Sequence, residues 1–267
     1  MIVFPNAKIN IGLYVVSRRP DGYHNLETLF YPVSLTDALE MAETGETGIS
    51  CSGLPVDGLP GNNLVLKAYH LLKQDFGLPP VQFHLHKTIP PGSGLGGGSS
   101  DAAFTLKMLN KYFNLHLNTE KLEKYAAALG ADCTFFVENK PAFATGKGDL
   151  LTAVDLDLSG YKIVIVKPKV DVNTAQAYKN VIPQPSRFRL NELHHFPVEH
   201  WKMLVKNDFE KSIFLCFPEI EIWKKKLYEL GAVYAAMSGS GSAVFGIFRH
   251  LPQEIYKKIP KSILFIR

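Results

Sequence analysis

The chain has 267 residues, of which 46% are apolar and 20% are charged, and its formal net charge is +4. This length allows one large domain or two ordinary ones, and the composition is that of a globular protein rather than a disordered or membrane-spanning one. The small basic excess suits anionic small molecules as substrates and is too diffuse to indicate nucleic-acid binding.

The start of the chain and its cysteines indicate the compartment. Residues 1–16 lack the basic, apolar and cleavage segments of a signal peptide, and no apolar run approaches the roughly 18 residues of a membrane span. Cys51, Cys133 and Cys216 are odd in number and widely spaced, which suits neither a disulfide framework nor a zinc site. We expect a cytoplasmic protein that binds neither membranes nor nucleic acid.

The first part of the chain alternates expected strands and helices. Residues 6–16 read as a strand with polar interruptions, and the Pro and Asp-Gly residues of 18–23 predict a turn. Residues 62–76 place apolar side chains at helical spacing after an Asn at the cap position. Residues 81–89 alternate apolar and polar side chains, which predicts a strand with one buried face.

Two helices are expected next, over about 99–113 and about 119–129, and Gly130 closes the second. The second half of the chain opens on a strand, continues as a helix with a proline break, and then places two apolar strands around a glycine-serine loop. These patterns predict two α+β modules, with domains over 1–156 and 157–267.

One segment, PPGSGLGGGSSDAA at residues 90–103, contains five glycines within seven positions. Clustered backbone N–H groups ahead of a helix form an anion site, because the free amides and the helix dipole both favour negative charge. Side chains would keep a polyphosphate from approaching those amides. Ser99 and Ser100 add hydroxyls that suit helix capping, phosphate oxygens or a metal ion. The alternative is a flexible turn, although ordinary turns need only one or two glycines.

The three commonest nucleotide loops are disfavoured. Gly92, Gly94 and Gly97 form a G-x-G-x-x-G string, but the strand before it is two-faced and a helix stands where a dinucleotide fold has its acidic strand end. The P-loop pattern is absent, since Gly146–Lys147 is followed by glycine. The sequence has no protein-kinase catalytic-loop or D-F-G motif.

The glycine-rich segment resembles the ATP loop of the GHMP kinases, a superfamily of small-molecule kinases. Two further motifs of that superfamily are matched by PNAKINIGL near the start of the chain and MSGSGSAVFG at 237–246. RRPDGYHNLETLF, NNLVLKA, GADCTFF and NDFE are similar to the members that act on a cytidine-diphosphate sugar alcohol. The resemblance spans nearly the whole chain. It implies a two-domain α+β fold, with a ribosomal-protein-S5-like N-terminal domain, a ferredoxin-like C-terminal domain and an active site in the cleft between them.

The resemblance also implies the ATP contacts and Mg²⁺ as a cofactor, without assigning the metal ligands. The residues expected to contact ATP are Pro90, Pro91, Gly92, Ser93, Gly94, Leu95, Gly96, Gly97, Gly98, Ser99 and Ser100, with Asn63 and Lys87 around the adenine. For Asn63 and Lys87, a solvated helix start and a solvated strand end remain the alternatives.

The catalytic pair implied by the resemblance is Asp132, which would accept the proton of the acceptor hydroxyl, and Lys8 beside it. An isolated Asp after a glycine-closed helix is more often a cap, and an isolated Lys in a strand is usually a solvated charge. The alternation of AKIN, however, places Lys8 and Asn10 on one strand face, opposite an apolar face, which suits a cleft wall. Cys133 and Thr134 stand where the family more often has Val-Pro, which could alter the local backbone.

The resemblance places the cytidine end of the acceptor against aromatic side chains. Tyr23 and His24 match family positions, and Tyr178 is expected as a second aromatic wall, because a base between two rings is a sound pocket. A turn-packing tyrosine and a surface histidine are the alternatives for Tyr23 and His24. The full set expected to bind this substrate is Asn10, Tyr23, His24, Lys147, Thr174, Tyr178, Gly239, Ser240 and Gly241, with Thr145 and Gly146 as neighbouring candidates.

The implied reaction is ATP-dependent phosphorylation of the 2-hydroxyl of a cytidine-diphosphate sugar alcohol in non-mevalonate isoprenoid synthesis. One alternative is a GHMP kinase of the homoserine or mevalonate type, whose acceptors do not require RRPDGYH or the aromatic at Tyr178. The other is a non-catalytic GHMP-fold binding protein, which we would expect to lack Asp132 or Lys8. The expected partners are small molecules, and the protein is expected to be a monomer or a homodimer.

Overall fold

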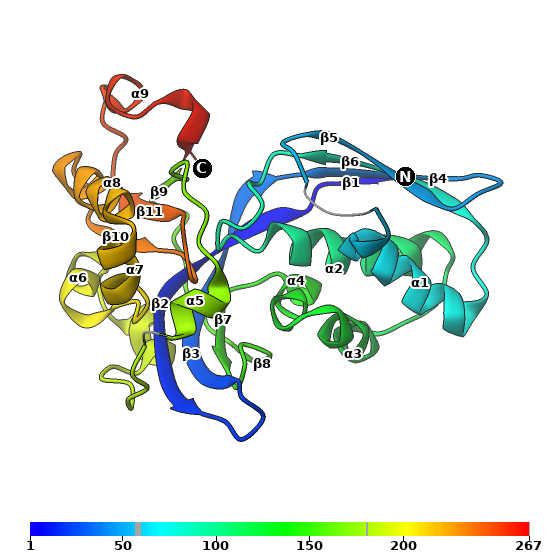
Figure 1. Ribbon diagram of the computed structural model, residues 1–267, viewed down its shortest axis with the longest axis horizontal. Coiled ribbons are helices and arrows are strands. Elements are labelled where there is room, and N and C mark those ends of the chain that lie inside the picture. The colour runs from blue at the N-terminus through cyan, green and yellow to red at the C-terminus, as the bar shows by residue number, and fades with distance from the viewer. Residues whose placement is uncertain (57–59, 180, 267) are drawn as a thin grey trace. The chain divides into compact units, whose positions relative to one another are not determined.

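A computed structural model describes residues 1–56, 60–179 and 181–266 (Figure 1). The chain forms two compact units. Unit 1 contains Met1–Ala7, Ser34–Pro91 and Gly96–Lys140, and unit 2 contains Lys8–Val33, Gly92–Leu95 and the chain from Pro141 onward. The domain boundary expected after residue 156 stays a prediction, because compact units built from interleaved segments need not follow sequence domains.

Unit 1 is a four-stranded sheet with helices packed on one face (Figure 1). Its strands run in the order β1 (Ile2–Val3), β4 (Ala38–Glu43), β6 (Val81–Lys87) and β5 (Gly48–Gly53), and its helices are α1 (Leu64–Phe76), α2 (Gly97–Tyr112), α3 (Thr119–Leu129) and α4 (Phe135–Glu138). β5 pairs with β6 in parallel, whereas β4 pairs with β1 and β6 antiparallel. The alternation along β6 is confirmed, because its odd-numbered residues are buried and its even-numbered residues are exposed.

The helix termini of unit 1 follow the sequence closely. The Asn63 side chain accepts a hydrogen bond from the Val65 backbone N–H at 2.9 Å and so caps α1, as predicted. α3 spans the predicted residues and closes at Gly130. α2 begins two residues before the expected position, at Gly97, because Gly96 adopts a left-handed φ of 72° that directs the chain into the helix.

Unit 2 contains two four-stranded sheets. The first has the order β2 (Asn6–Arg18), β3 (His24–Thr36), β7 (Ala142–Thr145) and β8 (Leu150–Ala153), and the second has the order β10 (Tyr234–Met237), β11 (Val244–Phe248), β9 (Lys162–Val166) and β12 (Leu264–Ile266). Helices α5 (Thr174–Lys179), α6 (Trp201–Leu204), α7 (Glu210–Cys216), α8 (Pro218–Glu229) and α9 (Ile255–Lys258) complete it.

The second sheet of unit 2 is covered by α7 and α8, whose buried Ile213, Ile220 and Leu227 join a core with Val164 and Phe248. The predicted proline break is confirmed, since α7 ends at Cys216 and α8 begins at Pro218.

Two further expectations concern the whole chain. Cys51, Cys133 and Cys216 are free thiols. Within the residues that the structure describes, none of the helices is both long and apolar enough to cross a membrane.

Candidate active site

The glycine-rich segment 90–103 needs its glycines for backbone geometry. Gly92, Gly94 and Gly96 have φ values of 61°, 79° and 72°, a left-handed conformation that other L-residues rarely adopt. At Gly94 there is also no room for a side chain, because a Cβ would lie 2.1 Å from the carbonyl oxygen of Ser238. The segment is therefore a shaped loop rather than a flexible turn.

The centre of this loop is anchored within unit 2. The backbone N–H of Lys8 in β2 donates to the Leu95 carbonyl at 2.9 Å, and the N–H of Ala243 donates to the Ser93 carbonyl at 3.0 Å. The Ser238 hydroxyl donates to the Gly94 carbonyl at 2.9 Å. These bonds fix the middle of the loop against the start of β2 and the segment that joins β10 to β11.

The first turn of α2 has the backbone features from which the sequence predicts an anion site. The helix has 16 residues, so its dipole and free N–H groups favour negative charge at Gly97, Gly98 and Ser99. Gly98 is exposed, and a Cβ built there would meet only the Leu64 Cδ1 atom, at 3.8 Å. The Ser100 Oγ atom is fully buried and has no hydrogen-bond partner among the described residues.

Asp132 lies in unit 1, in a short 3₁₀ turn (Ala131–Cys133) that follows α3. Its neighbour Cys133 is buried and interacts with Ser99 in the first turn of α2. Burial raises the pKa of the Cys133 thiol to about 11, although the contact with Ser99 opposes this shift. The turn that carries Asp132 is therefore tied to the glycine-rich end of α2.

At the Cys133-Thr134 departure, residue 134 has a φ that a proline could also adopt. Thr134 has a φ of −59°, which is the value that a proline ring imposes. The Thr134 hydroxyl also donates to the Ala131 carbonyl at 2.8 Å and so closes the turn. Cys133 contributes to the apolar core of unit 1, as a valine would.

Lys8 and Asn10 share one face of β2, as their spacing predicts, and both side chains are buried in unit 2. The Lys8 ammonium donates to the Asn10 side-chain oxygen at 2.6 Å and to the Gly94 carbonyl at 3.2 Å. The Asn10 amide in turn donates to the Thr28 hydroxyl of β3 at 2.9 Å. This network places a buried positive charge against the glycine loop and excludes a solvated edge lysine.

The predicted aromatic residues form two contacts in unit 2. The rings of His24 and Tyr178 stack with centroids 4.9 Å apart and planes inclined by 18°, and the Lys147 ammonium lies 5.1 Å from the centre of the Tyr23 ring. A separation of 4.9 Å is a single stacking distance, so no base fits between His24 and Tyr178 in this arrangement. The predicted base would therefore need an outer face of the pair, or a wider separation of the two rings.

The loop between β10 and β11 joins the remaining predicted residues of unit 2. The hydroxyls of Thr174 in α5 and Ser240 lie 3.0 Å apart. Gly239 and Gly241 have φ values of 57° and 89°, and a Cβ on Gly239 would lie 3.4 Å from the Asn10 side-chain oxygen. Unit 2 thus brings Lys8, Asn10, the centre of the glycine loop, Gly239, Ser240 and Thr174 together.

Sequence reasoning missed the residues that support this loop. The Asn207 amide donates to the carbonyls of Met237 and Gly239 at 2.9 and 2.8 Å, and a Glu210 carboxylate oxygen accepts the Met237 N–H at 2.8 Å. Both belong to the NDFE stretch, whose role is not evident from the sequence alone. A buried amide facing two carbonyls cannot be deduced from spacing, because the partners lie 30 residues or more away along the chain.

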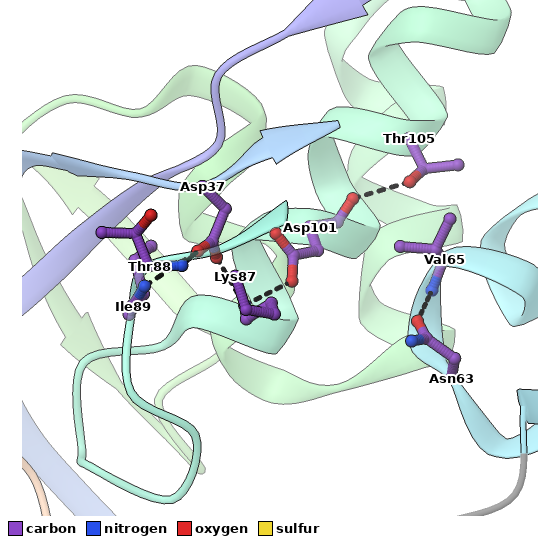
Figure 2. A network of polar contacts seen from close by, with 8 residues as sticks. All are labelled: Asp37, Asn63, Val65, Lys87, Thr88, Ile89, Asp101 and Thr105. Atoms are coloured by element: carbon purple, nitrogen blue, oxygen red, sulfur yellow. Dashed lines mark hydrogen bonds and ion pairs between the residues drawn. The ribbon is translucent and has the colours of Figure 1, made fainter. Parts of the chain in front are cut away.

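Lys87 and Asn63 both lie in unit 1, and the surroundings of Lys87 differ from a solvated position (Figure 2). Lys87 is 4% exposed, and its ammonium contacts the carboxylates of Asp37 and Asp101. Burial alone would lower the pKa of Lys87, but the two carboxylates raise it above its ordinary value. A solvated strand end is therefore wrong for Lys87, and Asn63 is the helix cap described above. Their contact with a nucleotide stays a prediction.

Comparison with known proteins places the chain in a family. Residues 63–140 match the GHMP kinases N terminal domain, and residues 190–263 match the GHMP kinases C terminal family. The 4-diphosphocytidyl-2-C-methyl-D-erythritol kinase of Bacteroides fragilis is 56% identical over 269 residues, covering 99% of this chain and 97% of that protein. The chain belongs to the GHMP kinases, within the 4-diphosphocytidyl-2-C-methyl-D-erythritol kinase family.

Solved structures agree with this GHMP kinase assignment. A crystal structure of 4-(cytidine 5'-diphospho)-2C-methyl-D-erythritol kinase is 34% identical, with a TM-score of 0.80 and coverage of 92% of this chain and 90% of that one. The mevalonate kinase of Methanococcus jannaschii has a TM-score of 0.71 at 15% identity, covering 100% of this chain and 96% of that one, and so shares the fold. The predicted family and α+β GHMP kinase fold are confirmed.

Proposed function

We propose that this GHMP kinase transfers the γ-phosphate of ATP to the 2-hydroxyl of 4-diphosphocytidyl-2-C-methyl-D-erythritol, a step in non-mevalonate isoprenoid synthesis. The observation that carries the proposal is the buried Lys8 ammonium, 3.2 Å from the Gly94 carbonyl of the glycine loop and 2.6 Å from Asn10. A cation held there offsets negative charge next to a loop built to receive phosphates.

ATP is bound by the glycine loop and the first turn of α2 in this proposal. The open face at Gly98 lets backbone amides reach phosphate oxygens, while Gly92, Gly94 and Gly96 set the loop's path. Asn63 remains the candidate nearest the adenine, whereas Lys87 is buried against Asp37 and Asp101 and supports the loop from within unit 1. The assignment of 1–156 and 157–267 as the two domains is supported by the order of the two family matches.

Mg²⁺ accompanies ATP in this proposal and offsets charge on its phosphates. In kinase sites this ion is bound by substrate phosphates and waters, together with only one or two protein oxygens. The unpartnered Ser100 Oγ atom in the first turn of α2 is the protein oxygen that would hold the ion.

Asp132 accepts the proton in the reaction we propose. A bond forms between the 2-hydroxyl oxygen and the γ-phosphorus, the bond from that phosphorus to the β–γ bridging oxygen breaks, and ADP leaves. The hydroxyl proton passes to the Asp132 carboxylate. The 3₁₀ turn that carries Asp132 is linked through Cys133 to Ser99 of α2, which supports a position near the phosphates.

The acceptor is recognised by the unit 2 residues. The cytosine has ring faces from Tyr23, His24 and Tyr178, and the diphosphate has a positive charge from Lys147. A polar surface is added by Thr174, Gly239, Ser240 and Gly241. We further propose that the protein acts in the cytoplasm as a monomer or homodimer.

A panel of acceptors tests this function. With Mg²⁺ and ATP, we expect kcat/KM to be highest for 4-diphosphocytidyl-2-C-methyl-D-erythritol, with homoserine and mevalonate as comparison acceptors. Equal or better turnover of homoserine or mevalonate would contradict the proposed substrate. Binding of both ligands without phosphate transfer would instead indicate a non-catalytic binding protein.

A further inference from the structure

The start of the glycine loop is held in unit 1 by a buried carboxylate. Asp37 lies between β3 and β4 and is almost completely buried. Its Oδ1 atom accepts the backbone N–H groups of Thr88 and Ile89 at 2.6 and 2.8 Å, directly after β6 and just before the loop (Figure 2). Asp37 therefore fixes the direction in which the chain enters the loop.

The end of the loop is held by a second carboxylate. Asp101 lies in α2, one turn after Gly97, and its Oδ2 atom is 2.7 Å from the Lys87 ammonium (Figure 2). The same ammonium contacts Asp37, so a single lysine joins the two carboxylates. A Cβ built on Gly97 would lie 3.3 Å from Lys87 Nζ, which shows that the ammonium packs beneath the first residue of α2.

Stability alone does not explain this arrangement. Buried ion pairs and triads contribute little net stability, because the desolvation of the charges offsets their attraction, and apolar replacements are often as stable. A second carboxylate facing the same ammonium is less favourable still, since its negative charge is not balanced whenever both carboxylates are ionised. The Asp101 Oδ1 atom is buried with no hydrogen-bond partner among the described residues. What the triad does supply is a fixed spacing between the two ends of the loop.

We infer that Asp37, Lys87 and Asp101 form a buried clamp that positions the ATP loop for the triphosphate. The inference rests on the proposed function of that loop. The three residues are positioning residues, because they act on the nucleotide through the backbone of the loop. In the alternative, Lys87 contacts the nucleotide directly. A clamp requires all three residues, whereas direct contact requires Lys87 alone.

Asp101→Asn separates these roles, because the substitution keeps the shape of the side chain and leaves Lys87 paired with Asp37. The matched control is Thr105→Val, which removes the buried 2.7 Å bond from the Thr105 hydroxyl to the Asp101 backbone carbonyl but leaves the three clamp side chains unchanged. We expect Asp101→Asn to raise the dissociation constant of a non-hydrolysable ATP analogue about tenfold. The affinity of Asp101→Asn for the cytidylated acceptor should stay within about twofold of wild type. Thr105→Val should change neither the affinity for the ATP analogue nor that for the acceptor.

A double-mutant cycle that combines Asp101→Asn with Lys87→Met completes the binding test. In a clamp, the double variant Lys87→Met/Asp101→Asn loses much less affinity for the analogue than the product of the two single losses. Additive losses would overturn the clamp. So would weakened binding in Lys87→Met together with unchanged binding in Asp101→Asn, which would indicate direct contact.

Amide hydrogen exchange of residues 92–99, measured without ligand, tests the clamp independently of nucleotide binding. We expect faster exchange in Asp101→Asn and unchanged exchange in Thr105→Val, at temperatures where both variants are fully folded by circular dichroism. Unchanged exchange in Asp101→Asn would overturn the clamp. If the wild-type protein bound no ATP analogue, the proposed function would fail while this measurement still decided the clamp.

Discussion

At the scale of single residues, the proposed chemistry depends on one carboxylate. Asp132→Asn keeps the size and hydrogen-bonding capacity of the side chain but removes the proton acceptor. We expect kcat to fall roughly 100-fold or more, the scale of general-base loss, while both substrates bind within a few-fold of wild type. Single-turnover rates with both substrates saturating measure this. Transfer of phosphate at nearly the wild-type rate by a folded variant would show that Asp132 is not the proton acceptor and has only a structural role in its turn.

Tyr178 carries a prediction about substrate recognition. Tyr178→Ala removes the ring that stacks on His24, so a stacked cytosine loses its support. We expect the KM of the cytidylated acceptor to rise about tenfold and the KM of ATP to stay unchanged, since stacking of one base contributes about 1–3 kcal/mol. Tyr256→Ala in α9, an exposed tyrosine outside the predicted site, is the control. Equal increases in both KM values would contradict the prediction.

Asp101 makes stability depend on pH. Burial raises the pKa of Asp101 to about 7, although Lys87 opposes the shift and Asp37 adds to it, whereas the ordinary value is 3.8. Between about pH 4 and 7 the folded protein therefore binds more protons at this group than the unfolded chain does. Its contribution to the free energy of unfolding falls as pH rises through this window, by at most about 1.4 kcal/mol per pH unit, and is constant above it.

The measurement compares Asp101→Asn with wild type by urea unfolding from about pH 4.5 to about pH 8. We expect the variant to gain stability relative to wild type as pH rises to about 7, after which the difference is constant. A difference that does not change with pH would show that Asp101 ionises at its ordinary value.

At the scale of elements, α2 distinguishes glycines required for packing from those required for binding. A Cβ on Gly97 would lie 2.8 Å from Ile89 Cγ2, whereas a Cβ on Gly98 meets nothing closer than 3.8 Å. We expect Gly97→Ala to lower the melting temperature. Gly98→Ala should keep or raise it, because alanine favours helix, yet should weaken ATP binding by covering the exposed amides. Calorimetry and thermal unfolding test the pair, and unchanged ATP affinity in Gly98→Ala would contradict the role of this turn.

Local signals in the sequence predicted some elements well and others poorly. α1 and α3 were predictable because each combines an Asn cap, apolar residues at helical spacing and a closing glycine. The long strand β3 was not identified, since a turn-forming stretch precedes it and its pairing with β7 joins residues more than 100 positions apart. The stacking of His24 on Tyr178 was also not predicted, because the two rings were expected to lie on opposite sides of a base.

At the scale of the whole molecule, some of the predicted site residues belong to unit 1 and the others to unit 2. Unit 1 holds the start of α2, Asp132 and the clamp, and unit 2 holds Lys8, Asn10 and the acceptor-binding residues. The glycine-rich segment passes from unit 1 to unit 2 and back. Resemblance of motifs predicted which residues belong to the site. The supporting residues Asp37, Asn207 and Glu210 could not be predicted, because the backbone groups that they hold lie far away in the sequence.

The most direct test of the proposed reaction is to locate the transferred phosphate. The wild-type protein is incubated with Mg²⁺, ATP labelled at the γ-phosphate and 4-diphosphocytidyl-2-C-methyl-D-erythritol, and the product is analysed by phosphorus NMR and by label recovery. We predict one labelled phosphate per ADP formed, bonded to the oxygen of the 2-hydroxyl. Label released as inorganic phosphate, or found on any other hydroxyl of the acceptor, would contradict the proposed reaction.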